Sequence, residues 1–304
     1  MSGHLALRAE NLVKDYGKIR ALSGVSLAVE PGEVFGFIGP NGAGKSTTIR
    51  ILLDLLRPTS GLVEVFGQNP RAGGPELRRR IGYLPGELVL PGKRKAGDYL
   101  AHLARLRGGA GGDLIEPLAK RFGLDLAKPI KSLSKGNKQK VGLVQAFMHR
   151  PELLILDEPS SGLDPLLQQE FLAMVKQASA QGSTIFMSSH VLSEVEEIAA
   201  RVGILRSGRM VDVDSIDELR RRAGQEVELR FAAPVTAGEF TCLDGVSDVV
   251  VADSQVRLVL RGEPNALLKT AARHHVVGWS AENRDLEELF LDFYRTEEVN
   301  TDGN

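Results

Sequence analysis

The chain has 304 residues, of which 42% are hydrophobic and 25% charged, with a formal net charge of −1. This composition is typical of a globular protein with one large domain or two unequal ones. The balance of 38 basic and 39 acidic residues disfavours a nucleic-acid partner, which usually needs a basic surplus. The single cysteine excludes an internal disulfide and fits a reducing cytosol.

No apolar run approaches the roughly 18 residues of a membrane-spanning helix. The N-terminal residues MSGHLALRAENL lack the basic and apolar segments of a secretory signal. We therefore expect a cytosolic protein that works at a membrane only through another chain.

Residues 5–38 predict short strands, and the apolar run from Glu33 to Ile38 predicts a buried one. A glycine-rich loop follows. Apolar residues at helical spacing from Ile49 to Leu56 then predict a helix that Pro58 ends. The predicted order is therefore strand, glycine loop and helix.

Residues 98–150 predict helices, with a flexible break at Gly108 to Gly112. Residues 153–156 predict a second buried strand, residues 167–178 a helix and residues 184–187 a third strand. Strands that alternate with helices favour an α/β fold around a mainly parallel sheet.

The pattern changes after residue 216. Alternating apolar residues at 227–231 and 256–260 predict strands, and Leu286 to Phe293 predict a helical face. We expect a first domain over residues 1–216 and a small α+β domain over residues 217–304.

The residues from Gly39 to Ser46 match the phosphate-loop pattern G-x-x-x-x-G-K-[ST]. Small residues let backbone N–H groups turn around an anion, and the first N–H groups of the following helix favour negative charge. Lys45 is expected to reach the β- and γ-phosphates of ATP, and the Ser46 hydroxyl to bind Mg²⁺.

Asp157 and Glu158 follow the second buried strand, where ligands of open parallel sheets bind. We expect Asp157 to hold Mg²⁺, through water, and Glu158 to polarise the attacking water as a general base.

Between these two motifs lies the segment Leu133-Ser-Lys-Gly-Asn-Lys-Gln139. Together, the motifs over about residues 5–215 closely resemble the nucleotide-binding subunit of ATP-binding cassette (ABC) transporters. The resemblance implies a P-loop ABC ATPase fold: a RecA-like core, an N-terminal antiparallel β subdomain and a helical subdomain at about residues 88–150.

The resemblance also implies roles for particular residues. Glu158 and His190 would be catalytic, and Asp164 would lie in the D-loop that links the two sites of a dimer. The signature segment would contact the ATP held by the opposite subunit; its residues are Ser134, Lys135, Gly136 and Asn137. The residues expected to bind ATP in the same chain are Tyr16, which stacks on adenine, and Gly39, Pro40, Asn41, Gly42, Ala43, Gly44, Lys45, Ser46 and Thr47.

The chain departs from the family pattern at two places. Lys135 and Asn137 replace a glycine and a glutamine of the usual signature LSGGQ. At the Q-loop position, where the family usually has a glutamine, this chain has Gly86 followed by Glu87. Because a carboxylate binds Mg²⁺ well, Glu87 is a candidate replacement.

The resemblance implies an ATPase that forms a homodimer with ATP and powers export through a separate ABC-2-type permease, from the cytoplasmic face of the membrane. Residues 88–150 would provide the permease-docking surface. A soluble ABC ATPase that acts on ribosomes or nucleic acid is the alternative, and the neutral charge disfavours it. A non-hydrolysing nucleotide sensor is a third possibility, against which Glu158 and His190 argue.

Overall fold

The computed structural model describes residues 5–284 and Leu286. The chain forms two compact units that divide between Val213 and Asp214; the sequence pattern put the boundary after residue 216. Apart from Leu286, the predicted helical face from Leu286 to Phe293 lies outside the described residues. No helix in the described part of the chain is long and apolar enough to cross a bilayer.

The first unit contains an antiparallel sheet with the strand order β2-β1-β4. Its strands are β1 (Leu7–Tyr16), β2 (Ile19–Val29) and β4 (Ser60–Val65). β1 and β2 are 10 and 11 residues long, so they are longer than the short strands expected here. Buried residues of β1, β2 and β4 pack with those of the neighbouring central sheet in one hydrophobic core.

The central sheet of the first unit has six strands in the order β5-β6-β7-β3-β8-β9. The pairs from β5 to β8 are parallel, and β3, β6 and β7 are buried along their whole length. Parallel strands covered on both faces need continuous apolar runs, which explains why the sequence revealed them. The strands are β3 (Val34–Ile38), β5 (Ile81–Leu84), β6 (Leu153–Asp157), β7 (Thr184–Ser189), β8 (Arg201–Arg206) and β9 (Arg209–Ser215).

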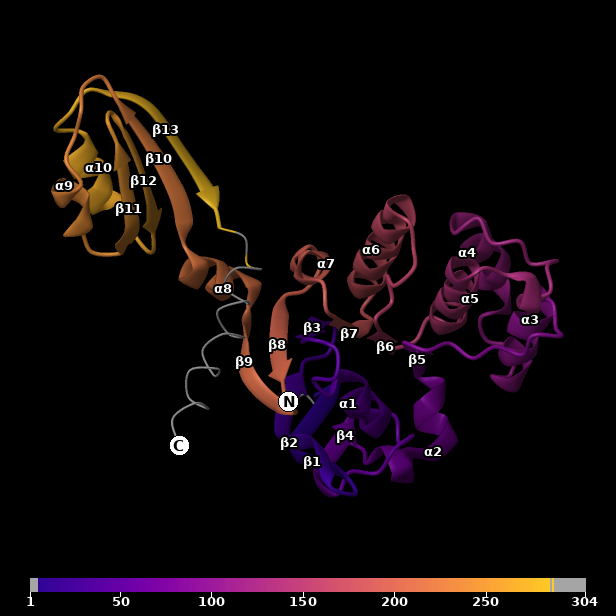
Figure 1. Cartoon of the computed structure of the whole chain (residues 1–304). Coiled ribbons are helices and arrows are strands. Elements are labelled where there is room, and N and C mark those ends of the chain that lie inside the picture. Colours follow the sequence, from indigo (N-terminus) through magenta and orange to yellow (C-terminus); the bar gives the residue numbers. More distant parts are fainter. Residues whose placement is uncertain (1–4, 285, 287–304) are drawn as a thin grey trace. The chain divides into compact units, whose positions relative to one another are not determined.

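Helices lie on both sides of this sheet, with α1 on one side and α6 and α7 on the other (Figure 1). These helices and the helix before β5 are α1 (Lys45–Leu52), α2 (Pro70–Arg79), α6 (Pro165–Ala180) and α7 (Leu192–Glu196).

The prediction that the first helix runs to Leu56 is wrong, because α1 ends at Leu52. Asp54 takes a left-handed backbone with φ of 55°, and the Leu56 N–H bonds back to the Arg50 carbonyl at 3.1 Å. Leu56 still packs against the core, so its apolar spacing reflects burial rather than helix.

Three helices gather beyond β5: α3 (Ala96–Leu106), α4 (Ile115–Arg121) and α5 (Lys135–Phe147) (Figure 1). Short 3₁₀ turns at Gly112–Leu114 and Ile130–Ser132 precede α4 and α5. The glycine break predicted at residues 108–112 falls between α3 and α4, where the chain forms turns.

The second unit begins at Asp214, two residues before α8, and forms a sheet in the order β11-β12-β10-β13, which confirms the predicted α+β class. Its β-α-β-β-α-β order is that of ferredoxin-like folds. Apolar residues of β10 and β12 pack with the two later helices in a separate core. The elements are α8 (Ile216–Ala223), β10 (Gln225–Phe231), α9 (Gly238–Thr241), β11 (Val246–Ala252), β12 (Gln255–Leu260), α10 (Asn265–Ala271) and β13 (Val276–Asn283).

Candidate active site

The phosphate loop joins the carboxyl end of β3 to the first turn of α1. Gly44 takes a left-handed backbone with φ of 110°, and a Cβ there would lie 2.9 Å from the Ala21 carbonyl oxygen. A Cβ at Gly39 would lie 2.3 Å from the Leu205 carbonyl oxygen. The two glycines are therefore required by close packing of the loop against neighbouring backbone.

Lys45 lies beneath this loop, with only 6% of its surface exposed. Its Nζ donates to the carbonyl oxygens of Gly39 at 2.6 Å and Pro40 at 3.3 Å, and it pairs with Glu158 Oε1 at 3.1 Å. A cavity of about 200 Å³ opens above it. A buried cation, small residues and a helix N-terminus around one cavity are suited to a polyphosphate. The cavity is lined by Ala21, Pro40, Asn41, Gly42, Gly44, Lys45, Ser46, Thr47 and Glu158.

The carboxylates at the end of β6 are held by a serine from the neighbouring strand β7. Asp157 is 3% exposed, and its Oδ1 accepts a hydrogen bond from Ser188 Oγ at 2.6 Å. The same Ser188 Oγ accepts from the backbone N–H of Glu158 at 3.1 Å. Glu158 has a left-handed backbone, with φ of 49°, which is unusual for a residue with a side chain. Such strained residues concentrate at functional sites.

Glu158 connects the phosphate loop to the residue that follows β7. Its Oε2 contacts His190 Nδ1 at 2.6 Å, while its Oε1 faces the Lys45 ammonium. The Glu158 side chain is 19% exposed and that of His190 is 51% exposed. A half-buried carboxylate between a fixed cation and a solvent-facing imidazole is placed to orient a water molecule and accept its proton.

A second cavity, of about 310 Å³, shares Asn41, Ser46 and Glu158 with the first. It collects residues from the carboxyl ends of β3, β5, β6 and β7, as expected for an open parallel sheet. The residues that line it are Asn41, Ser46, Arg50, Gly86, Glu87, Asp157, Glu158, Ser161 and His190.

The oxygen atoms in this second cavity fit a magnesium ion bound together with phosphates. The Ser46 hydroxyl and the Asp157 carboxylate are hard donors that line the same space. The residues described by the structure contain no group of three or more His, Cys, Asp or Glu side chains able to hold a metal ion. Mg²⁺ commonly uses one or two carboxylates and completes its shell with substrate phosphates and water.

Gly86 and Glu87 both line this cavity. A Cβ at Gly86 would lie 3.2 Å from Asp157 Oδ2, so a glutamine at this position would require a small shift of its neighbours. The chain therefore has a glycine in tight contact with one carboxylate and a second carboxylate beside it.

Of the described residues that line the two cavities, none belongs to the signature segment. Ser134 caps α5, accepting from the Asn137 N–H at 3.3 Å and from Asn137 Nδ2 at 3.2 Å. A Cβ at Gly136 would lie 2.8 Å from the Gly162 carbonyl oxygen, and the stem of Lys135 lies beside Gly162. The signature segment thus packs on the loop that contains Gly162 and contributes no lining residue to either cavity of its own chain.

Asp164 and Tyr16 also lie apart from the residues that line the cavities. Asp164 caps α6, where its Oδ1 accepts from the Leu167 N–H at 3.1 Å. Tyr16 ends β1 with 45% of its surface exposed, and Lys14 Nζ lies 5.2 Å from its ring centroid.

Sequence reasoning missed three residues of the site: Ala21 and Arg50 line a cavity, and Ser188 holds a carboxylate. Ser161, which also lines a cavity, begins the segment Ser161 to Asp164 that the resemblance assigned to the D-loop. Ser188 carried the only signal, because it precedes His190 at the end of a predicted strand. Its bond to Asp157 depends on the pairing of β6 with β7, which places the two residues in register.

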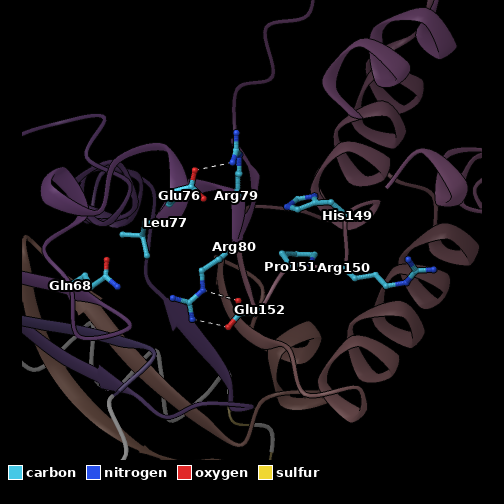
Figure 2. Close-up of a pocket in the computed structure, with 9 residues that line it drawn as sticks. All are labelled: Gln68, Glu76, Leu77, Arg79, Arg80, His149, Arg150, Pro151 and Glu152. Carbon is cyan, nitrogen blue, oxygen red and sulfur yellow. Dashed lines mark hydrogen bonds and ion pairs between the residues drawn. The ribbon is translucent and has the colours of Figure 1, made fainter. Parts of the chain in front are cut away.

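Another cavity, of about 370 Å³, lies where β5 and β6 begin, at the opposite edge of the sheet (Figure 2). There Arg80 makes two bonds of 2.7 Å to Glu152, and the His149 Nε2 contacts the Ile81 carbonyl oxygen at 3.2 Å. Burial lowers the pKa of His149 to about 4, so the imidazole is neutral at physiological pH. The phosphate loop and the carboxylates of Asp157 and Glu158 lie at the other edge of the sheet, where the strands end. That edge is therefore the candidate active site.

A strand, a glycine loop and a helix around a polyphosphate-sized cavity, with Glu158 and His190 beside it, define a P-loop nucleotide hydrolase. The family model for ABC transporters matches residues 22–161. The chain belongs to the family of ABC transporter ATP-binding subunits, and it is an ATPase that binds ATP. This supports the transporter interpretation rather than the ribosomal or nucleic-acid alternative.

Several relatives carry this conclusion. The chain is similar to the bacitracin transport ATP-binding protein BcrA of Bacillus licheniformis, with 36% identity over 74% of this chain and 75% of the relative. It is also similar to the linearmycin resistance ATP-binding protein LnrL of Bacillus subtilis (strain 168), with 32% identity over 94% and 97% of the two chains. A solved ATP-binding subunit of an ABC transporter has 33% identity and a TM-score of 0.67, over 71% of this chain and 92% of that one. The predicted P-loop ABC ATPase fold is confirmed.

Proposed function

We propose that this chain powers export through a separate ABC-2-type permease, to which it binds from the cytoplasmic face of the membrane. Relatives named for bacitracin transport and linearmycin resistance support an export role. The observation that carries the proposal is the division of the ATP site. The phosphate loop and Glu158 share one cavity, whereas the signature segment lies elsewhere in the same chain.

A second copy of the chain supplies the missing half of this site. The N-terminus of α5, capped by Ser134, brings together the first backbone N–H groups of a helix, a hydroxyl and the Lys135 ammonium. Such a helix end favours the terminal phosphate of an ATP held by the facing subunit. ATP would then join two subunits, and hydrolysis would separate them.

Within one subunit, Lys45 binds the β- and γ-phosphates and His190 contacts the terminal phosphate. Ser46 and Asp157 would hold Mg²⁺, which neutralises phosphate charge when it is bound. Glu158 orients the attacking water and accepts its proton. Tyr16 stacks on adenine, and Asp164 communicates between the two sites of the dimer.

Glu87 takes the place of the missing Q-loop glutamine near the metal. It lines the same cavity as Ser46 and Asp157, and no ion pair to another described residue holds it elsewhere. Residues 88–150 would dock the permease, and the unit after Val213 would stabilise the dimer or regulate it.

The Glu158→Gln protein tests the proposal, because it should keep ATP bound without cleaving it. With Mg²⁺ and ATP it should elute as a dimer in gel filtration, and it should co-purify with a polytopic membrane protein. Adding Ser134→Arg, which blocks the signature surface, should restore the monomer while ATP binding remains. A Glu158→Gln protein that binds ATP yet stays monomeric would contradict the sandwich arrangement.

A further inference from the structure

Two loops of the helical segment run side by side on the surface of the first unit. The segment before α3 and the segment before α5 are joined by backbone hydrogen bonds: Ile130 N to Arg94 O at 2.9 Å, Lys131 N to Gly92 O at 3.0 Å, and Ala96 N to Lys128 O at 3.1 Å. The backbone of both segments is therefore held in place.

These loops carry a basic strip, which we define as Lys93, Arg94, Lys95, Lys128 and Lys131. All five residues are exposed. Segments 92–97 and 126–131 contain these five basic residues and no acidic residue. Within the described part of the chain, only Lys128 pairs with a carboxylate, that of Asp125, at 3.8 Å.

Other exposed cations of the first unit are of two kinds. Some have carboxylate partners, such as Arg150 with Asp113 at 2.9 Å, and others, such as Arg57 and Arg71, have none among the described residues. The strip differs in carrying five exposed cations on two adjoining segments. The whole chain has a net charge of −1, so the strip is a local concentration of positive charge rather than part of a basic protein. Like charges held close together repel one another unless a polyanion lies opposite them.

An exposed apolar residue precedes the strip in the chain. Val89, four positions before Lys93, is 91% exposed. Four of the five cations are lysines, whose flexible stems and compact charges suit a diffuse anionic surface better than a single bidentate ligand. Clustered lysines, with an exposed apolar side chain a few positions earlier in the chain, match the chemistry of a bilayer surface with anionic headgroups.

We propose that the basic strip binds the anionic lipid headgroups of the membrane on which this subunit works. The proposal rests on the proposed function, since that function brings residues 88–150, which contain the strip, to a permease and therefore to the membrane around it. Each lysine or arginine near an anionic leaflet contributes about 1 kcal/mol, and the attraction weakens within a Debye length of about 8 Å at physiological salt. The strip would orient the subunit toward the bilayer and raise its local concentration at the permease.

Vesicle binding by the full chain, without permease or ATP, tests this directly. The probes are phosphatidylcholine vesicles with and without phosphatidylglycerol. The variant Lys93→Gln/Arg94→Gln/Lys95→Gln loses three charges from the strip. The matched control, Arg57→Gln/Arg71→Gln/Lys269→Gln, loses three exposed charges elsewhere, none of which pairs with a carboxylate of the described residues.

The unmodified chain and the control should bind the anionic vesicles and not the neutral ones. The strip variant should bind roughly a hundredfold more weakly, from three lost contributions. High salt should release the chain, and inorganic phosphate should release it no more than chloride of equal ionic strength does.

Equal binding of the strip variant and the control, or no binding to anionic vesicles, would overturn the proposal. Release by phosphate at low ionic strength would do the same, because it would indicate a site for a free anion. If the chain binds no vesicles but binds an acidic protein segment, the strip would be assigned to a protein partner instead. The rate of ATP hydrolysis in solution is measured separately, so a chain that hydrolyses ATP but does not bind lipid can be recognised.

Discussion

Replacing Glu158 by Gln should change two properties in opposite directions. The side chain keeps its shape but loses its charge and its ability to accept a proton. Without nucleotide, the carboxylate pairs with Lys45 at 3.1 Å and contacts His190 at 2.6 Å. On the proposed roles, the substitution removes the general base and also frees the Lys45 ammonium to bind phosphate.

General values for a lost base and for a broken ion pair give both magnitudes. Loss of a general base lowers a catalytic rate by roughly 10²–10⁴-fold. Two charges at the Lys45–Glu158 distance attract each other by about 5 kcal/mol at an effective dielectric constant near 20, and desolvation offsets most of this. A residual of about 1.4 kcal/mol raises ATP affinity about tenfold. Removing the repulsion between Glu158 and the terminal phosphate acts in the same direction.

Steady-state ATPase rates and equilibrium binding of ATP measure the two effects. Glu152→Gln is the matched control, because Glu152 also pairs with a cation, Arg80 at 2.7 Å, and lies at the opposite edge of the sheet. It should leave rate and affinity within about threefold of the unmodified chain, as expected away from the reacting groups. If Glu158→Gln hydrolyses ATP at the normal rate, or binds ATP more weakly, the assigned role of this carboxylate is wrong.

Three further predictions concern His149, Gly136 and Glu87. The pKa of His149 is about 4 when folded and near 6.5 when unfolded, so the unfolded chain takes up the proton first as pH falls. As pH falls between these values, the free energy of unfolding should therefore decrease by about 1.4 kcal/mol per pH unit, or about 2 kcal/mol by pH 5. Denaturant titrations of the His149→Gln protein should show that this contribution is lost. Equal slopes of unfolding free energy against pH for the two proteins would contradict this prediction. Gly136→Ala should destabilise the first unit by about 1–3 kcal/mol, measured by thermal unfolding, because the new Cβ would meet the Gly162 carbonyl oxygen at 2.8 Å. Glu87→Ala should weaken binding of Mn²⁺ with ADP several-fold, measured by electron paramagnetic resonance, whereas Glu87→Gln should restore part of it; unchanged binding in both would exclude Glu87 as a metal ligand.

Local chemistry made much of this protein readable from its sequence. The phosphate loop needs glycines, a lysine and a serine at fixed spacing, and β3 and β6 needed continuous apolar runs because they are buried on both faces. Asp157 and Glu158 stand where such a strand ends, so their place at the carboxyl edge followed from the parallel sheet. The family resemblance then supplied the roles of Ser134 and His190, whose own patterns are short.

Only the tertiary structure decided how these pieces meet. Apolar spacing could not show that α1 ends at Leu52. Leu56 would be buried on the same face whether the helix continued to it or ended before it. The bond from Ser188 to Asp157, the contact of Gly86 with Asp157 and the neighbouring loops of the basic strip join residues far apart in the chain. A one-dimensional pattern records which side chains are apolar or charged. The distances between them are set by strand pairing and core packing, which act on the whole unit at once.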